Sequence, residues 1–182
     1  MTVTAANYSG KYDGSAHEGG ATPSVTEGTT VQYSTDGGAT WSSTVPSIKD
    51  FGTVSYKVKA TNPNYSEATA DGTLEVTKRS VTLASAGDTK VYDGTPLVKN
   101  AQTDVTVGGD GFVAGEGATY TIAGAQTDVG SSDNEFTYVL NEGTLAANYE
   151  IADPTYGKLV VTPAAMTVTA ANYSGKYDGS AH

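Results

Sequence analysis

The chain contains no cysteine, so no disulfide bond can hold it together, and its stability must come from core packing, neighbour contacts or another kind of crosslink. Basic residues are also scarce: 10 Lys and Arg stand against 20 Asp and Glu, which gives a formal net charge of −10. This balance argues against nucleic acid and against an anionic membrane surface as partners. No apolar run is long enough to span a bilayer, which argues against membrane insertion.

Residue types that carry catalysis are equally scarce. Arg79 is the only arginine, and His17 and His182 occupy the same position of a repeat, so each period holds one histidine. One histidine cannot form a metal cluster or a base–nucleophile pair by itself. Carboxylates are abundant, but glycoside hydrolysis needs a cleft between two of them, which small strand modules rarely offer. We therefore assign no catalytic residue and no resident metal or cofactor, and we expect that the chain is not an enzyme.

An internal repeat organises the sequence. Residues 1–17 read MTVTAANYSGKYDGSAH, and residues 166–182 read the same letter for letter. Self-similarity at a fixed period is the signature of a repeat architecture. The chain is therefore predicted to hold one full period and the beginning of the next, as a piece cut from a long array would.

A weaker repeat lies inside the period. Four short motifs occur in the same order in both halves: a Tyr-Asp-Gly turn, an Asp-x-Gly step before a strand-like run, an Asn-Tyr pair, and a final Gly-x-Leu-x-Val-Thr. They are Tyr12-Asp13-Gly14 and Tyr92-Asp93-Gly94, Asp50-Phe51-Gly52 and Asp128-Val129-Gly130, Asn64-Tyr65 and Asn148-Tyr149, and residues 72–77 and 157–162. We therefore predict two diverged modules, residues 1–79 and 80–165, with residues 166–182 starting the next repeat.

The local pattern is strand and turn almost throughout. Residues 54–60 alternate apolar and polar side chains, which is the period of a half-buried strand, and residues 120–122 and 136–140 are similar. Thr, Val and Tyr dominate these runs, and Gly, Asn, Asp and Pro separate them. We expect a mainly β fold of two small modules. The scarcity of helical pattern favours an immunoglobulin-like sandwich, and a β-grasp-like sheet is the alternative.

The module junctions indicate an elongated shape. Only Lys78-Arg79-Ser80 separates the strand-like end of the first module from the strand-like start of the second. The Gly/Ser-rich linkers of independent domains are missing at both junctions. The modules are therefore predicted to lie end to end as a semi-rigid rod, with the first strand of residues 166–182 extending from the second module. That last segment could also pair head to tail with another chain.

The order of the motifs carries a family resemblance. Tyr-Asp-Gly near the start, Asn-Tyr late in each module and Gly-x-Leu-x-Val-Thr at the end resemble the MBG and YDG repeat modules of bacterial surface proteins and adhesins. Residues 31–41 strengthen the match of the first module, and residues 128–149 that of the second. The resemblance covers nearly the whole chain. It implies a large secreted or wall-attached bacterial protein with many such modules, and it transfers no ligand-binding residue.

Each recurring motif also has a structural interpretation. In a Tyr-Asp-Gly turn the Gly supplies a positive φ and the Asp bonds its own backbone, so the Tyr would fill a core or corner position. An Asn-Tyr pair is predicted to repeat this device at the far side of the module. The structural positions are Tyr12, Asp13, Gly14, Asn64, Tyr65, Tyr92, Asp93, Gly94, Asn148 and Tyr149.

Trp41 is the one residue singled out as a candidate ligand contact, because an exposed Trp could stack on a sugar. It ends the stretch Ser34-Thr35-Asp36-Gly37-Gly38-Ala39-Thr40-Trp41, which resembles the Asp-box hairpin of sialidases. One copy in two small modules cannot make a propeller, and the arginine cluster of those enzymes is missing. The stretch is better interpreted as a hairpin whose Asp caps the loop and whose Trp packs beneath it.

Two further kinds of chemistry are alternatives. A calcium site could use Asp110, Glu116 or Asp133, although their spacing matches no calcium loop. A covalent bond between a Lys and an Asn side chain, or between a Thr and a Gln, could stiffen a module without cysteine. The candidate lysines are Lys11, Lys57, Lys59, Lys90, Lys99 and Lys158, although their pattern favours solvent-facing strand positions.

Three functions follow from these observations. The leading hypothesis is a structural stalk that projects a terminal domain from a bacterial cell surface, whose partners are the neighbouring repeats. The second is an adhesive module that binds mucin glycans or a host protein. The third, an enzyme, is disfavoured.

Overall fold

The computed structural model describes residues 1–181, and nearly all its regular structure is β-strand. The described residues form 16 strands and two 3₁₀ turns of three residues each, η1 (Gln102–Asp104) and η2 (Ala146–Asn148). The expected mainly β fold is confirmed. A β-grasp-like sheet is not, because no helix in residues 1–181 is long enough to cross a sheet. No helix in this part of the chain could cross a bilayer either.

The strands up to residue 77 pair only with one another, and we call residues 1–78 the N-terminal unit. Its main sheet has the order β2-β8-β7-β5, and two small antiparallel pairs, β1 with β4 and β3 with β6, form the other layer. The strands are β1 (Val3–Ala5), β2 (Tyr8–Lys11), β3 (His17–Glu18), β4 (Ala21–Pro23), β5 (Thr30–Ser34), β6 (Ser47–Ile48), β7 (Gly52–Asn62) and β8 (Tyr65–Thr77).

The strands from residue 79 to 162 likewise pair only with one another, and we call residues 79–162 the C-terminal unit. Its sheets have the orders β11-β9-β15, β10-β16-β13 and β12-β14. The strands are β9 (Arg79–Ser85), β10 (Asp88–Val91), β11 (Val105–Gly109), β12 (Ala118–Ile122), β13 (Gly130–Asp133), β14 (Phe136–Leu140), β15 (Tyr149–Ile151) and β16 (Lys158–Thr162). That each unit is an independent domain stays a prediction.

The two units share most of their strand pairings, but β15 pairs in parallel with β9, whereas the first half of β8 pairs with β7. In the N-terminal unit, β5, β7 and β8 pair in the order of the C, F and G strands of an immunoglobulin sandwich, and β1 pairs with β4 as A pairs with B. In the C-terminal unit, β12 pairs with β14 and β13 with β16, so the F and G strands are present but interrupted. The early strand that runs parallel to the last one is β2 in the first unit and β10 in the second.

The recurring motifs occupy corresponding register positions. Gly10 and Gly52 flank Val76 in the first unit, and Lys90 and Gly130 flank Val161 in the second. In both units, the first residue after the parallel strand donates its backbone N–H to the carbonyl oxygen of the residue that ends the last strand. The bonds are Tyr12 N to Thr77 O and Tyr92 N to Thr162 O, at 2.9 and 2.8 Å.

The two layers of the N-terminal unit are joined by Tyr56 of β7. Its ring lies across Gly72 of β8, where a Cβ atom would come within 2.3 Å of the ring. Its hydroxyl donates to the carbonyl oxygen of Ala6 and accepts from the N–H of Gly20, both at the edge of the other layer. In the C-terminal unit the corresponding side chain is Asn134, whose amide donates to the carbonyl oxygen of Ala86 at 2.9 Å.

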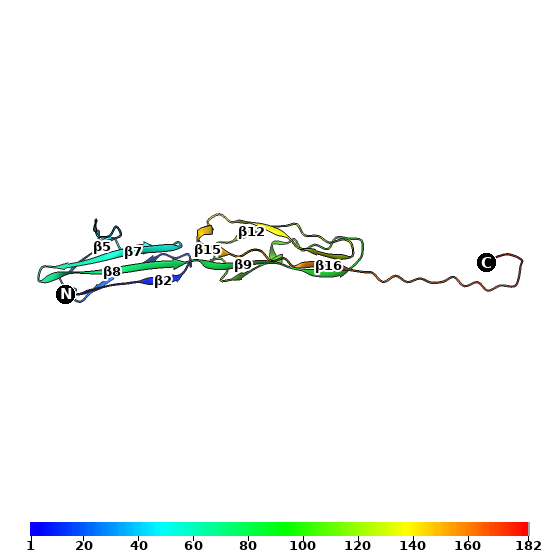
Figure 1. Ribbon diagram of the computed structural model, residues 1–182, viewed down its shortest axis with the longest axis horizontal. Helices are drawn as coiled ribbons and strands as arrows, with labels where there is room; N and C mark the ends of the chain where they lie inside the picture. The colour runs from blue at the N-terminus through cyan, green and yellow to red at the C-terminus, as the bar shows by residue number, and fades with distance from the viewer. Residues whose placement is uncertain (182) are drawn as a thin grey trace.

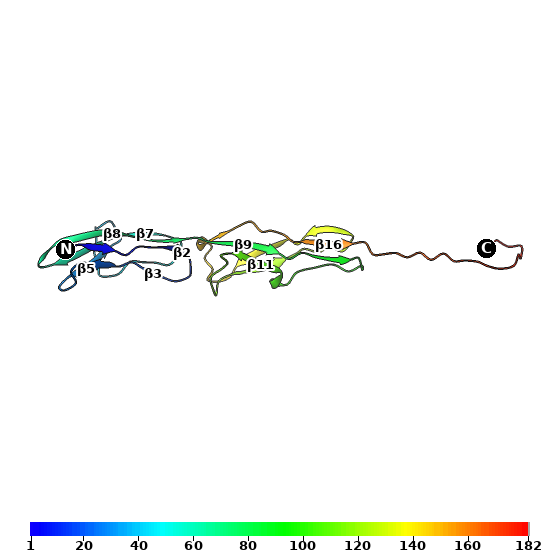
Figure 2. The same ribbon diagram turned by 90° about the horizontal axis from the view of Figure 1, so that it is seen from below.

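The units lie end to end along one axis, as Figures 1 and 2 show. Only Lys78 separates β8 from β9, and these two strands run on in nearly the same direction. One cluster of buried apolar side chains continues through the contact, from Tyr56 and Leu74 in the first unit to Val81 and Phe136 in the second. A second cluster, Leu97, Leu159 and Val161, lies within the C-terminal unit.

The chain after β16 continues outward along the axis but forms no strand within residues 163–181, so the expected strand in residues 166–182 is not found there. The same sequence forms β1 and β2 in the N-terminal unit, where these strands pair with β4 and β8. In the described residues β4 and β8 are already paired with β1 and β2, which explains the difference. Residue 182 lies outside the described residues, and pairing of this segment with another chain stays a prediction.

Gly72→Ala tests whether the Tyr56 bridge holds the two layers together. The added Cβ would displace a buried ring, so we expect a loss of about 1–3 kcal/mol in the free energy of unfolding, measured by denaturant titration. Thr69→Ala, at an exposed position of the same strand, should stay within about 0.5 kcal/mol of the unchanged protein. Equal effects of the two substitutions would contradict this role of Tyr56.

Candidate functional site

The most elaborate set of side-chain contacts in the described chain lies where the two units meet, and we call it the junction. Tyr12 enters it from the turn after β2 and is only 3% exposed. Its ring packs edge to face against that of Tyr149 at 5.6 Å between centroids, and Phe112 packs edge to face against Tyr149 at 5.1 Å. Aromatic rings from both units therefore form the centre of the contact.

Glu116 joins the two tyrosines. The Tyr12 hydroxyl donates to Glu116 Oε1 at 2.5 Å, and the Tyr149 hydroxyl donates to Glu116 Oε2 at 2.7 Å. The Tyr149 hydroxyl also accepts from the backbone N–H of Val113 at 3.1 Å. Hydrogen bonds to a carboxylate are stronger than neutral ones, and these two lie in a largely buried place. One carboxylate thus fixes the position of a ring from each unit.

Asn148, which has no exposed surface, hydrogen-bonds the other unit through both atoms of its side-chain amide. Its Oδ1 accepts from the backbone N–H of Phe51 at 2.8 Å, and its Nδ2 donates to Asp50 Oδ1 at 2.9 Å. The Asp-x-Gly step before β7 therefore serves as the partner of the Asn-Tyr pair of the next unit. Asn148 is placed by η2, whose last residue it is.

A charged group flanks the aromatic centre. Lys11 Nζ pairs with both carboxylate oxygens of Asp110 at 2.8 Å, from opposite units. Arg79 donates through Nε to the carbonyl oxygen of Gly111 at 2.7 Å and through Nη2 to that of Asp110 at 2.7 Å. The hydrogen bond from Lys11 and those from Ser80 hold the pKa of Asp110 well below its usual range. Because Lys11 is well exposed, solvent screens this ion pair and its contribution to stability is small.

The junction raises the pKa of both tyrosines. The hydrogen bond to Glu116, together with burial, raises the pKa of Tyr12 to about 12. Burial, with Glu116 as a further cause, raises the pKa of Tyr149 to about 12. Both hydroxyls therefore stay protonated at neutral pH and act as hydrogen-bond donors, and the bond from Tyr12 to Glu116 joins the two units.

The Tyr-Asp-Gly turns have the same local geometry in each place. Gly14, Gly94 and Gly179 have φ values of 81°, 81° and 78°. The Asp carboxylate accepts from the N–H two residues later, at 2.8 Å for Asp13 and 2.9 Å for Asp93. These bonds help to hold the pKa of both carboxyls below the usual range, with Lys90 the largest cause for Asp93.

The tyrosines of these turns differ in burial. Tyr12 is in the junction, whereas Tyr92 is 41% exposed at the opposite end of the C-terminal unit. The expectation of a core or corner position therefore describes Tyr12 and not Tyr92 in this chain. The physical reason is that Tyr12 is covered by Tyr149 and Glu116 of the next unit, and no described residue covers Tyr92 in the same way.

The Asn-Tyr pairs differ in the same sense. Tyr149, like Tyr12, is 3% exposed, whereas Tyr65 is 49% exposed. Asn64 and Tyr65 lie where β7 turns into β8, at the end of the N-terminal unit that points away from the junction. Each pair lies at the opposite end of its unit from the Tyr-Asp-Gly turn.

Trp41 ends a loop that is closed by Asp36. Thr40 donates to both carboxylate oxygens, through N at 2.9 Å and Oγ1 at 2.5 Å, and the hydrogen bond from Ser34 is the largest cause of a lowered Asp36 pKa. The indole N–H donates to the carbonyl oxygen of Gly38 at 3.0 Å, and Lys59 Nζ lies 4.4 Å from the ring centroid. The half-buried ring therefore already makes polar and cation–π contacts within the unit.

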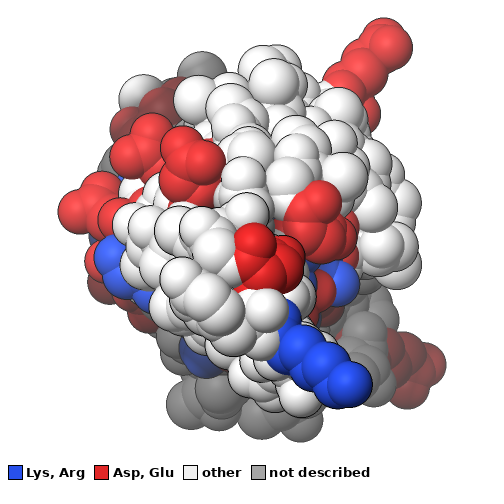
Figure 3. All heavy atoms as spheres, turned by 90° about the vertical axis from the view of Figure 1, so that its right-hand side faces the viewer, with Lys and Arg blue, Asp and Glu red and all other residues white. Residues whose placement is uncertain are grey.

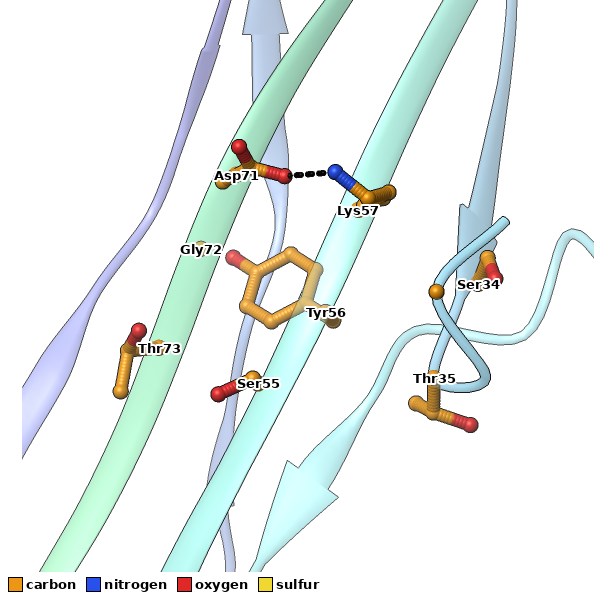
Figure 4. Close-up of a pocket in the computed structure, with 9 residues that line it drawn as sticks. Ser34, Thr35, Ser55, Tyr56, Lys57, Asp71, Gly72 and Thr73 are labelled. Atoms are coloured by element: carbon orange, nitrogen blue, oxygen red, sulfur yellow. Dashed lines mark hydrogen bonds and ion pairs between the residues drawn. The ribbon is translucent and has the colours of Figure 1, made fainter.

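A shallow hollow of about 350 Å³ lies beside this loop. Figure 4 shows Lys57 and Asp71 paired across β7 and β8, at 2.6 Å, next to the hydroxyl groups of Ser55 and Thr73. These groups can hydrogen-bond a polar molecule. The charged pair is already closed, and the hollow contains no histidine.

The calcium candidates are not brought together. Asp110 pairs with Lys11, Glu116 accepts from two tyrosines, and Asp133 pairs with Lys158. Within residues 1–181 no group of three His, Cys, Asp or Glu side chains could hold a metal ion. The six candidate lysines contact Asp carboxylates or, in the case of Lys59, the Trp41 ring.

Sequence reasoning missed the central role of Glu116. A signal was present, because Glu27-Gly28 and Glu116-Gly117 both precede a strand of their unit. Comparison with family models finds none that matches the chain, and comparison with curated proteins finds no match.

Substituting the two equivalent tyrosines separates junction packing from local turn formation. Tyr12→Ala removes a buried ring and leaves Glu116 with one donor, so we expect a loss of about 3–5 kcal/mol in the free energy of unfolding. Tyr92→Ala should cost less than about 1 kcal/mol in this chain, because the ring is largely solvated. Denaturant unfolding of both variants tests the contrast, and similar losses would refute the importance of the junction.

Alkaline pH should weaken the junction. The tyrosine pKa is about 10 in an unfolded chain and about 12 in the folded protein for Tyr12 and Tyr149. Their contribution to stability is therefore full below about pH 10 and is lost as the pH rises through 12. Glu116→Gln removes the negative charge, so the tyrosinate absorbance of Tyr12 should appear at lower pH than in the unchanged protein. An unshifted titration would contradict the coupling.

Proposed function

We propose that this chain is a structural spacer, a stalk segment of a large bacterial surface protein that holds a terminal domain away from the cell. The junction carries this proposal. A spacer must keep successive units at a fixed angle, and the junction combines a one-residue connection, a continuous apolar core and a buried hydrogen-bond network.

The continuous core supports the same function energetically. A unit of about 80 residues buries a modest core when it folds alone. Here the apolar cluster of the first unit continues through Tyr12 and Tyr149 into the second, so each unit stabilises its neighbour. Such nearest-neighbour coupling is how linear repeat proteins remain stiff. The chain achieves this without disulfide bonds.

The surface charge fits a protein that stays soluble while extended. Figure 3, which views the end toward which the C-terminus lies, shows acidic side chains spread over the surface and basic ones scattered among them. With a net charge of −10, neighbouring stalks would repel one another and remain separate at low ionic strength. The proposed partners are the neighbouring repeats of the same chain, and the proposed location is extracellular.

The adhesive alternative rests on Trp41. A hollow of about 290 Å³ lies beside its ring, lined also by Tyr33, Thr40 and Val45, and could accept part of a sugar. The contacts of the ring with Lys59 and Gly38 favour a structural role. We therefore retain glycan binding as the second candidate function.

Small-angle scattering of the whole chain tests the spacer. We expect one elongated particle for the unchanged protein and a more flexible one for Tyr12→Ala, because the variant loses the centre of the junction. A compact or freely jointed unchanged particle would reject the proposal.

A glycan array with Trp41→Ala as the paired variant tests the alternative. Micromolar binding that is lost in the variant would replace the spacer by an adhesive module. An unbound array, with a stability loss of about 2 kcal/mol in the variant, would support the structural role of this half-buried ring.

A further inference from the structure

We propose that the two free ends of the 165-residue period are complementary, and that the C-terminal unit docks onto the N-terminal unit of the next copy through a second junction. The partner is a second copy of residues 1–79, beginning at Met166. The proposal rests on the spacer function for its biological setting, but its structural argument comes from the junction already described.

The first component of the second junction is Tyr92. Tyr92 corresponds to Tyr12 because each follows the strand that runs parallel to the last strand of its unit. Each also donates its backbone N–H to the carbonyl oxygen of the residue that ends that last strand. Both are held by the same Tyr-Asp-Gly turn, with Gly φ values of 81°. Tyr12 is buried by the next unit, whereas Tyr92 is exposed at the end where the next copy begins.

The second component is the Asp128-Val129 backbone. Asp50 and Phe51, which precede Gly52 of β7, bond Asn148 of the neighbouring unit. Asp128 and Val129 precede Gly130 of β13 in the corresponding register, and Val129 is exposed. They therefore present the same N–H and carboxylate to an asparagine from the next copy.

The residues that would contact Tyr92 and Asp128-Val129 lie at the other end of the period. In the junction the corresponding residues are Glu116, Asn148 and Tyr149. Asn64 and Tyr65 correspond to the last two by sequence and by their place before the last strand.

Glu27 corresponds to Glu116 by strand register. Tyr33 pairs with Val58 on β7, and Ile122 pairs with Phe136 on β14, at the same position of the two F strands. Counting back six residues along the paired strands gives Glu27 in one unit and Glu116 in the other.

Glu27, Asn64 and Tyr65 line one hollow. About 480 Å³ of open space at this end of the N-terminal unit is lined by Val25, Glu27, Gly28, Asn64 and Tyr65, with Asn62 and Pro63. In the junction the Tyr12 ring contacts the corresponding residues Glu116 and Tyr149. The hollow thus offers a carboxylate, an amide and an aromatic face to a tyrosine from a preceding copy. Tyr92 is the tyrosine that a preceding copy presents at this place.

The covalent connection has the right length. Lys78, Arg79 and Ser80 lie between Thr77 and Val81, and Pro163, Ala164 and Ala165 lie between Thr162 and Met166. Thr77 and Thr162 are equivalent because each accepts the N–H of the tyrosine in a Tyr-Asp-Gly turn. Ala6 and Ala86 accept the equivalent bonds of Tyr56 and Asn134, so Val81 corresponds to Met1 and therefore to Met166. The same number of residues therefore joins the units at both places.

The second junction differs from the first in charge. In the second junction Val91 stands at the position that Lys11 of the Lys11–Asp110 pair occupies in the first. Ala164 stands at the position of Arg79. The second junction is therefore more apolar at its edge than the first. Its stability should depend less on salt than that of the first junction.

A lengthened chain tests the proposal. Adding residues 18–79 after His182 completes the next N-terminal unit, and nitration by tetranitromethane then reports the accessibility of Tyr92. We expect Tyr92 to react readily in the present chain and at least about tenfold more slowly in the lengthened one. Tyr156, which is 40% exposed and lies away from both ends, is the internal control and should react equally in both chains.

The two copies of Glu27 give a matched pair of variants. Glu27→Ala in the added copy should restore the nitration of Tyr92, whereas the same change in the first copy should not. Equal nitration of Tyr92 in the present and the lengthened chain would overturn the proposal. Scattering of the lengthened chain decides the spacer separately: a straight particle with a reactive Tyr92 would reject only this contact, and a freely bent one would reject both.

Discussion

The single residue between β8 and β9 constrains everything else in the structure. Because the last strand of one unit leads directly into the first strand of the next, the ends of the two units are held within contact distance. At that distance the facing polar groups must be satisfied or exposed to water, and the chain satisfies them through Glu116 and Asn148. The buried tyrosines and the continuous core follow from this closeness.

The contacts at the junction couple the stability of the two units. Separating the two units would expose both Tyr12 and Tyr149 and would leave Asn148 without its hydrogen-bond partners. An exposed edge of this kind costs the apolar burial of two rings and the pairing of a buried amide. The stability of one unit therefore includes a term that belongs to its neighbour, as in linear repeat proteins.

The sequence predicted the mainly β fold, the turns and the order of the motifs, because period-2 alternation and Asp-Gly chemistry are local. It did not predict which tyrosines are buried, since Tyr12 and Tyr92 occupy the same local turn and differ only in what lies beyond it. The role of Glu116 could not be predicted for a related reason. Its partners are 104 and 33 residues away, and no local pattern joins them.

The segment that repeats the N-terminus separates local from long-range determinants most clearly. Gly179 has nearly the same φ as Gly14, and Ser180 N–H bonds Asp178 as Ser15 N–H bonds Asp13, so the turn forms without a surrounding sheet. The strands do not form, because β1 and β2 need β4 and β8. A repeat of this kind carries its own turns but borrows its strands from residues that follow it.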